Sequence, residues 1–339
     1  MRAKNIKAIA LVSGGLDSVL AAKIVAEQGI EVIAVNFIVP FWLPEKQESM
    51  QKQVFNSCQQ IGVRCETVDI SSQCRQMIKD PQYGFGSHMN PCIDCRLLML
   101  KKAGELLKGF EASFLITGEV VGQRPMSQKK ETMRMIEKNS GLEGLILRPL
   151  SAKLLEETIP EQKGWVDRAQ FFGISGRGRG VQMDLARQLQ ISDYPNPGGG
   201  CLLTDPAFSR RFQDLLTHGV WKQRDLDLLK MGRVFRINHG SKLIVGRNEG
   251  ENAALEKAAG EDDIVFTPLP QVSGPSALGV GQFIHPGDVA LCAMIVCRYV
   301  NKSTSPTGDI CEILIKRYGK QECLHVPPLK EEDIRYYQV

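Results

Sequence analysis

Short apolar runs alternate with amphipathic stretches along the N-terminal part of the chain. Residues 7–12 form an apolar run that stops at a Ser-Gly-Gly turn, and residues 16–28 then carry apolar side chains at helical spacing. The same alternation predicts strands at 31–39, 63–70, 113–118 and 144–148, and helices at 46–61 and 92–108. Because strands separated by helices form parallel sheets, the pattern predicts an α/β fold with a doubly wound parallel sheet. The functional site of such a sheet lies beyond the carboxyl ends of its strands.

The pattern changes after about residue 150, where the chain becomes rich in Gly, Arg and Pro up to residue 200. One helical stretch falls there, at about 181–190, and residues 206–231 also have helical spacing. Farther on, the pattern predicts strands at 233–237, 242–246 and 289–299 and a helix at 249–259. We therefore predict two domains, a doubly wound domain over residues 1–204 and a smaller α+β domain over residues 205–339.

Composition places the chain among ordinary globular proteins. It has 339 residues, of which 43% are hydrophobic and 24% charged, which excludes disordered, collagenous and coiled-coil classes. No run reaches the roughly 18 apolar residues of a membrane span. The first apolar run leads straight into a turn with an Asp, so we expect no signal peptide and a cytoplasmic protein. The net charge of +4 permits a nucleic-acid partner without arguing for one.

Ten cysteines are the unusual feature of the composition. In a reducing compartment we expect free thiols, so clustered cysteines suggest metal ligands or nucleophiles. Cys92 and Cys95 have CxxC spacing at the start of a predicted helix, which lets both sulfurs face one metal and favours thiolate. Cys201 follows three glycines and is a third candidate. We expect the other cysteines to be core or incidental residues: Cys58, Cys65, Cys74, Cys292, Cys297, Cys311 and Cys323.

The segment SGGLDS, at residues 13–18, stands between a predicted strand and a predicted helix. Its glycines let the backbone approach an anion, and the free amides of a helix start point at that anion. Ser13 and Ser18 can donate hydroxyl groups to phosphate, and Asp17 is compatible with phosphate if Mg²⁺ lies between them. The alternative is a plain turn with a serine cap. The residues predicted for this phosphate loop are Ser13, Gly14, Gly15, Asp17 and Ser18.

SGGLDS resembles the SGGxDS signature of the N-type ATP pyrophosphatases, the PP-loop family. The resemblance implies the adenine nucleotide alpha hydrolase-like fold, with the β- and γ-phosphates of ATP on this loop. It also implies that an oxygen of the substrate is adenylated, that pyrophosphate is released, and that a nucleophile then displaces AMP. The family includes amide-forming synthetases and tRNA thiouridine synthases, and the loop alone does not choose between them.

Two further segments resemble the tRNA thiolases of this family. NPCIDC, at residues 90–95, is similar to the NPC-xx-C segment of the 2-thiouridylase branch. TGEVVGQRPMSQ, at residues 117–128, is similar to the TGE-xx-GQ-xx-SQ segment of the 4-thiouridine synthases, which implies that Gly118 and Gln123 border the nucleotide. The resemblance, which covers roughly residues 7–205, implies that ATP adenylates O2 or O4 of a tRNA uridine and that sulfur replaces AMP.

Two mechanisms compete for the thiols. In one, a cysteine carries a persulfide and a second cysteine closes a disulfide to release the product. In the other, Cys92, Cys95 and Cys201 hold three irons of a [4Fe-4S] cluster, and the fourth iron is open to sulfide. Three cysteines favour the cluster, and a zinc ion would need a fourth ligand that the sequence does not offer. The catalytic set is then Asp17, Cys92, Cys95 and Cys201.

Basic residues suggest an RNA partner. Residues 123–153 carry seven Lys or Arg against three Asp or Glu, and residues 232–236 and 243–249 resemble the RNA-binding domain of the NFACT group. We expect tRNA and a sulfur donor (sulfide or a cysteine desulfurase) as partners, no membrane, and we allow for a homodimer. Two rivals stay open: a PP-loop enzyme that amidates a small molecule, and an ATP-dependent sulfur-carrier protein. The candidate RNA contacts are Arg124, Lys129, Lys130, Arg177 and Arg179.

Overall fold

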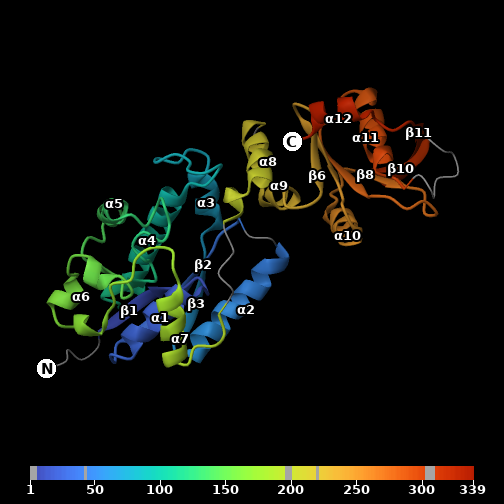
Figure 1. Cartoon of the computed structure of the whole chain (residues 1–339). Helices are drawn as coiled ribbons and strands as arrows, with labels where there is room; N and C mark the ends of the chain where they lie inside the picture. Colours follow the sequence, from blue (N-terminus) through green and yellow to red (C-terminus); the bar gives the residue numbers. More distant parts are fainter. Residues whose placement is uncertain (1–5, 42–43, 195–200, 219–220, 302–309) are drawn as a thin grey trace. The chain divides into compact units, whose positions relative to one another are not determined.

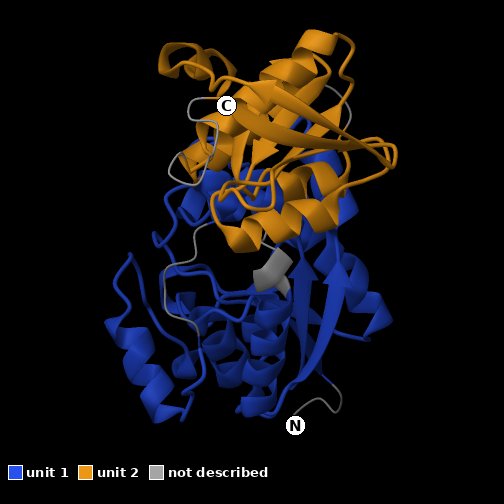
Figure 2. Ribbon diagram, turned by 90° about the vertical axis from the view of Figure 1, so that its right-hand side faces the viewer, with its two compact units in different colours: residues 1–204 blue, residues 205–339 orange. Residues whose placement is uncertain are grey.

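The computed structural model describes residues 6–41, 44–194, 201–218, 221–301 and 310–339. The chain divides into two compact units, Met1–Thr204 and Asp205–Val339, which Figure 2 draws in different colours. Each unit has its own sheet.

The first unit is built on a five-stranded sheet in the order β3-β2-β1-β4-β5, and all of its strand pairs are parallel. Sequential order is broken between β3 and β4, where the chain crosses from one side of β1 to the other. Figure 1 labels β1, β2 and β3 of this sheet. The predicted doubly wound fold is therefore confirmed. The strands are β1 (Lys7–Leu11), β2 (Glu31–Ile38), β3 (Arg64–Asp69), β4 (Phe114–Thr117) and β5 (Ile146–Leu147).

Helices cover both faces of this sheet, which explains why β1 is apolar from Ala8 to Leu11. Ala8 and Ala10 of β1 belong to the core formed with α1, α2 and α7, whereas Ile9 and Leu11 face the core formed with α4 and α5. The helices are α1 (Leu16–Ala26), α2 (Pro44–Gln60), α3 (Ser71–Met77), α4 (Cys92–Gly109), α5 (Lys130–Ser140), α6 (Ile159–Gln162) and α7 (Gly180–Gln188). Short 3₁₀ turns lie at Ala152–Leu154, Arg168–Gln170 and Leu202–Thr204.

The second unit is a six-stranded antiparallel sheet in the order β11-β10-β8-β9-β7-β6, and helix α11 packs against β6, β8, β10 and β11. Its strands are β6 (Arg233–Asn238), β7 (Ser241–Val245), β8 (Ile264–Pro268), β9 (Ala277–Gly281), β10 (Cys311–Arg317) and β11 (Lys320–Val326). Its helices are α8 (Pro206–Thr217), α9 (Gln223–Leu228), α10 (Glu249–Ala258), α11 (Pro286–Arg298) and α12 (Glu331–Tyr337).

The structure corrects two predicted elements of this unit. The strand predicted at 289–299 is wrong, because these residues belong to helix α11. Pro286 stands in the first turn of α11, and the carboxylate of Asp288 accepts a hydrogen bond from the backbone amide of His285. A fully apolar run has no periodicity that would separate a buried helix from a buried strand. The helical stretch predicted at 206–231 consists of two helices, α8 and α9.

The expectation that all thiols are free is also wrong, because Cys297 and Cys311 form a disulfide between α11 and β10. Both residues are buried in the core of the second unit, as expected for core cysteines. In the part of the chain that the structure describes, no helix combines the length and the apolar character that crossing a bilayer requires.

Candidate functional site

The phosphate loop joins the carboxyl end of β1 to the first turn of α1. Ser18 Oγ donates a hydrogen bond to the carbonyl oxygen of Gly15 at 2.7 Å and accepts one from the Ser13 amide at 3.2 Å. The Ser18 hydroxyl therefore forms hydrogen bonds within the loop, whereas the sequence predicts that it donates to phosphate. The Ser13 side chain is exposed.

Asp17 is the buried acidic group of this loop. Its Oδ2 accepts hydrogen bonds from Gln123 Nε2 at 3.1 Å and from Arg179 Nη2 at 3.3 Å. Its Oδ1 is buried and has no hydrogen-bond partner. Since a buried carboxylate oxygen without a partner is costly, this atom fits an oxygen-seeking cation such as Mg²⁺.

Gly118 brings the end of β4 against the phosphate loop. A Cβ on Gly118 would lie 2.4 Å from the amide nitrogen of Ser18 and 2.5 Å from the carbonyl carbon of Asp17. Only glycine allows this contact of backbone with backbone. Together with the bond between Gln123 and Asp17, it places residues 117–128 beside the phosphate loop.

The same segment reaches the CxxC helix. Cys92 begins α4, and its Sγ donates to the hydroxyl oxygen of Ser127 at 3.3 Å. Cys95 follows one turn later and interacts electrostatically with the thiols of Cys92, Cys201 and Cys74. The structure therefore gathers the three predicted cysteines and adds Cys74, which lies on α3 and was expected to be incidental.

Burial controls the charge of these thiols. It raises the pKa of Cys95 and of Cys201, and the neighbouring thiols raise both further. It also raises the pKa of Cys74 to about 12. The thiolate expected for Cys95 at a helix start is therefore wrong, because the loss of solvent outweighs the helix dipole. Cys95 is a neutral thiol at pH 7 until a ligand or reactant takes its proton.

No group of three or more His, Cys, Asp or Glu side chains among the described residues is placed to hold a metal ion. The thiols of Cys92, Cys95 and Cys201 are therefore not arranged in advance around a zinc ion or any other metal centre. The groups that act most strongly on Cys95 are the thiols of Cys74, Cys201 and Cys92, followed by the guanidinium of Arg96. Sulfur donors of this kind are those of an iron–sulfur cluster or of a thiol–disulfide relay.

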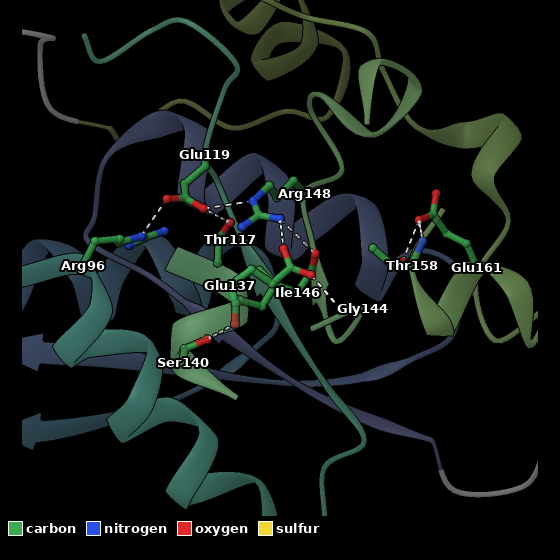
Figure 3. A network of polar contacts seen from close by, with 10 residues as sticks. All are labelled: Arg96, Thr117, Glu119, Glu137, Ser140, Gly144, Ile146, Arg148, Thr158 and Glu161. Atoms are coloured by element: carbon green, nitrogen blue, oxygen red, sulfur yellow. Dashed lines mark hydrogen bonds and ion pairs between the residues drawn. The ribbon is translucent and has the colours of Figure 1, made fainter. Parts of the chain in front are cut away.

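A buried ion-pair network ties these parts together, and Figure 3 shows it from close by. Glu119 Oε1 accepts from Arg96 Nε at 2.7 Å, and its Oε2 accepts from Arg148 Nε at 3.0 Å and from Thr117 Oγ1 at 3.1 Å. Arg148 Nη1 in turn donates to Glu137 Oε2 at 2.6 Å. Arg96 follows Cys95 on α4 and Glu119 follows Gly118, so the network links the thiol helix to the strand end beside the phosphate loop.

Burial alone would raise the pKa of Glu119, but the guanidinium groups of Arg96 and Arg148 overcome it and lower the pKa from 4.5 to about 2. Replacing Glu119 by glutamine is expected to lower the free energy of unfolding at pH 7 by about 3 kcal/mol, because it leaves buried cations short of a partner. Urea unfolding at pH 7 measures the loss. Glu105→Gln is the matched control, since it removes an exposed pair with Lys102 on the same helix, worth at most about 1 kcal/mol.

The stabilisation that Glu119 provides depends on pH in a direction that its lowered pKa sets. Because the pKa of Glu119 is lowered on folding, its stabilisation is fully present above pH 4.5 and is lost as the pH falls towards 2. The difference between wild type and Glu119→Gln should therefore shrink below pH 4.5. Equal losses for Glu119→Gln and Glu105→Gln would show that the buried network adds no stability.

The five basic residues predicted to bind RNA do not share one environment. Arg124, Lys129, Lys130 and Arg177 are exposed. Arg179 is half-buried before α7, and its guanidinium binds Asp17 of the phosphate loop. Its charge is therefore paired with the loop's aspartate. Sequence reasoning also gave no role to Glu119 and Ser127, although both belong to the segment whose resemblance it used.

The fold and this site define a doubly wound α/β protein whose anion loop, thiols and connecting segment meet at the carboxyl edge of the parallel sheet. Residues 4–160 match the family model described as thiamine biosynthesis protein (ThiI), and residues 232–338 match the NFACT protein RNA binding domain. The first unit thus carries a ThiI-type domain and the second an NFACT-type domain, which confirms the resemblance drawn from the motifs.

The chain is also similar to individual relatives and to a solved structure. The probable tRNA sulfurtransferase of Thermococcus kodakarensis is 30% identical over 155 residues, which are 45% of this chain and 39% of that protein. The tRNA-specific 2-thiouridylase MnmA 1 of Syntrophus aciditrophicus is 24% identical over 223 residues, 60% of this chain and 54% of that protein. A solved 4-thiouridine synthetase–RNA complex with bound ATP is 20% identical, with a TM-score of 0.36 over 54% of this chain and 50% of that one. The chain therefore spans about half or less of the length of these curated relatives.

Proposed function

We propose that the protein is a tRNA sulfurtransferase that uses ATP to replace an oxygen of a uridine by sulfur. One observation carries the proposal: the segment 117–128 contacts both halves of the site. Gly118 and Gln123 touch the phosphate loop, and Ser127 touches the first cysteine of the CxxC pair. A nucleotide site and a sulfur site joined by one short segment suit a reaction in which activation and sulfur transfer occur on the same base. The sequence relatives are tRNA sulfurtransferases and thiouridylases by name.

The phosphate loop would hold ATP. The backbone amides of Gly14 and Gly15 and the Arg179 guanidinium would bind phosphate oxygens, and Gly118 and Gln123 would border the nucleotide. The unpartnered Oδ1 of Asp17 would bind Mg²⁺, which neutralises charge on the departing pyrophosphate. Adenylation turns the O2 or O4 of the uridine from a poor leaving group into AMP, which explains why ATP is consumed in exchanging one atom.

The thiols of Cys92, Cys95 and Cys201 would deliver the sulfur. If they hold a [4Fe-4S] cluster, Cys92, Cys95 and Cys201 would be its protein ligands, and the group would supply a binding site for the sulfide that is transferred. If they act alone, the outer sulfur of a cysteine persulfide would attack the adenylated carbon and expel AMP. A second thiol would then attack the cysteine sulfur of the resulting mixed disulfide, which releases the thiouridine and leaves a protein disulfide. Either route requires the thiols of Cys95 and Cys201, whose pKa values are raised by burial, to lose their protons on loading.

The RNA would lie across exposed basic side chains and the second unit. Arg124, Lys129, Lys130 and Arg177 supply cations for the phosphate backbone, and the NFACT-type domain supplies a second RNA surface. We expect the enzyme to work in the cytoplasm, with sulfide or a cysteine desulfurase as the sulfur donor. A homodimer stays a prediction.

The deciding experiment is anaerobic purification followed by iron and sulfide assay and by mass spectrometry of tRNA nucleosides. We expect thiouridine to form only with ATP, with one pyrophosphate released for each sulfur inserted. About four irons per chain would assign the cluster route, and an iron-free protein that still thiolates tRNA would assign the persulfide route. Pyrophosphate release driven by ammonia and a small acid, without tRNA, would replace the proposal by an amidating enzyme. Sulfur transfer to a protein without tRNA binding would replace it by a sulfur carrier.

A further inference from the structure

A strained tyrosine stands at the tip of the last hairpin of the chain. Arg317 of β10 pairs with Lys320 of β11, so the turn between them consists of Tyr318 and Gly319 alone. Both have positive φ, 50° for Tyr318 and 71° for Gly319, as a type I′ turn requires. Asn is the residue that suits the first position of this turn, whereas a bulky aromatic side chain is disfavoured there. A tyrosine at this position therefore calls for a reason other than folding.

The aromatic ring of Tyr318 is presented to solvent beside a hollow of about 510 Å³. The side chain of Tyr318 is 61% exposed, and that of Ile284, which lines the same hollow, is 71% exposed. The Arg317 guanidinium lies 4.9 Å from the centre of the Tyr318 ring, and its Nε is buried without a hydrogen-bond partner. The hollow is lined by Asp262, Gly281, Gln282, Phe283, Ile284, Arg317 and Tyr318.

The charged and polar residues around the hollow indicate which kind of ligand it can bind. Lys316 and Lys320 flank the turn and are exposed, so two cations lie within two residues of Tyr318 along the chain. Inside the hollow, the Asp262 carboxylate would repel a phosphate, and Gln282 offers both a donor and an acceptor. A carboxylate and an amide beside an aromatic face suit a flat ring with N–H groups on its edge. The outer cations suit a phosphate chain that carries this ring.

We propose that this hollow binds one unpaired nucleobase of an RNA strand. The base would stack on Tyr318 against Ile284, its amino edge would meet Asp262 and Gln282, and the flanking phosphates would meet Lys316 and Lys320. This inference rests on the proposed RNA partner and names a site for it within the NFACT-type domain. A guanine or cytosine would be preferred over uracil, since both carry an exocyclic amino group for Asp262.

The test uses Tyr318→Asn in the full chain. Asparagine followed by glycine favours the turn, so thermal stability should stay equal or rise, while the stacking face is removed. The affinity for a labelled single-stranded RNA of mixed sequence, measured by fluorescence anisotropy, should fall about tenfold, as expected for one lost base–aromatic stack. Tyr318→Phe is the matched control and should bind as the wild type does. The salt dependence of binding should be unchanged, because the phosphate contacts remain.

Three outcomes would overturn the inference. Unchanged affinity of Tyr318→Asn for single-stranded RNA would remove the base site and leave the proposed sulfurtransferase intact. An equal loss on the same RNA annealed to its complement would assign the hairpin to the phosphate backbone of a duplex. A wild type that binds no RNA at all would refute both the hollow and the proposed tRNA substrate, and the pyrophosphate assay would then show whether ATP chemistry survives without RNA.

Discussion

Replacing Cys201 by alanine is expected to abolish thiouridine formation while pyrophosphate release continues. Cys201 lies among the thiols that act on Cys95, and the interactions that tie residues 117–128 to the phosphate loop do not involve it. Removing its sulfur therefore takes away a cluster ligand or a relay thiol and leaves the nucleotide side unchanged. Mass spectrometry of tRNA nucleosides and a pyrophosphate assay on the same sample measure the two halves separately.

The iron content of the Cys201→Ala protein separates the two sulfur routes. Loss of about four irons per chain together with activity would show that Cys201 is a cluster ligand. If the wild-type protein holds no iron and the Cys201→Ala protein is inactive, Cys201 is a member of the persulfide relay. Cys65→Ala is the control, because Cys65 is a partly buried thiol of the same unit whose partner is Cys58. A Cys201→Ala protein that thiolates tRNA at the wild-type rate would remove this residue from the site.

Replacing Asp17 by asparagine is expected to slow ATP-dependent pyrophosphate release by about 100-fold or more, because a carboxylate ligand of the metal ion is lost. Asparagine keeps the side-chain oxygen that Gln123 and Arg179 contact, so the loop should fold as before. The rate is measured while Mg²⁺ is varied, and the variant should need far more Mg²⁺ than the wild type. Chelation with EDTA should stop the wild-type reaction.

Asp184→Asn is the matched control for Asp17, since Asp184 is an exposed aspartate on α7 that pairs with the nearby Arg187. Its loss should change neither the rate nor the Mg²⁺ requirement. If Asp17→Asn shows the wild-type Mg²⁺ dependence, the cation is held elsewhere and the role assigned to the unpartnered Oδ1 is wrong.

Several elements of the site could be predicted because each depends on a short piece of chain. The run at residues 7–12, its glycine stop and the helical spacing after it predict the strand, loop and helix that the structure has there. The helix predicted at 92–108 is α4, with Cys92 at its first position. The prediction of a strand at 289–299 was wrong because residues 289–297 are all apolar and show no periodicity. Whether such a run forms a helix or a strand is decided by how it packs against the sheet.

The α/β class, the loop between β1 and α1, the CxxC helix and the resemblance to the tRNA thiolases could all be predicted from the sequence, since they depend on local spacing and composition. Only the tertiary structure brought Glu119 between Arg96 and Arg148, placed Cys74 among the thiols, and turned Arg179 onto Asp17. Each of these contacts joins residues that lie far apart along the chain, and burial sets their charge. Water would otherwise screen the same groups, so their electrostatic roles arise when the fold removes the solvent between them.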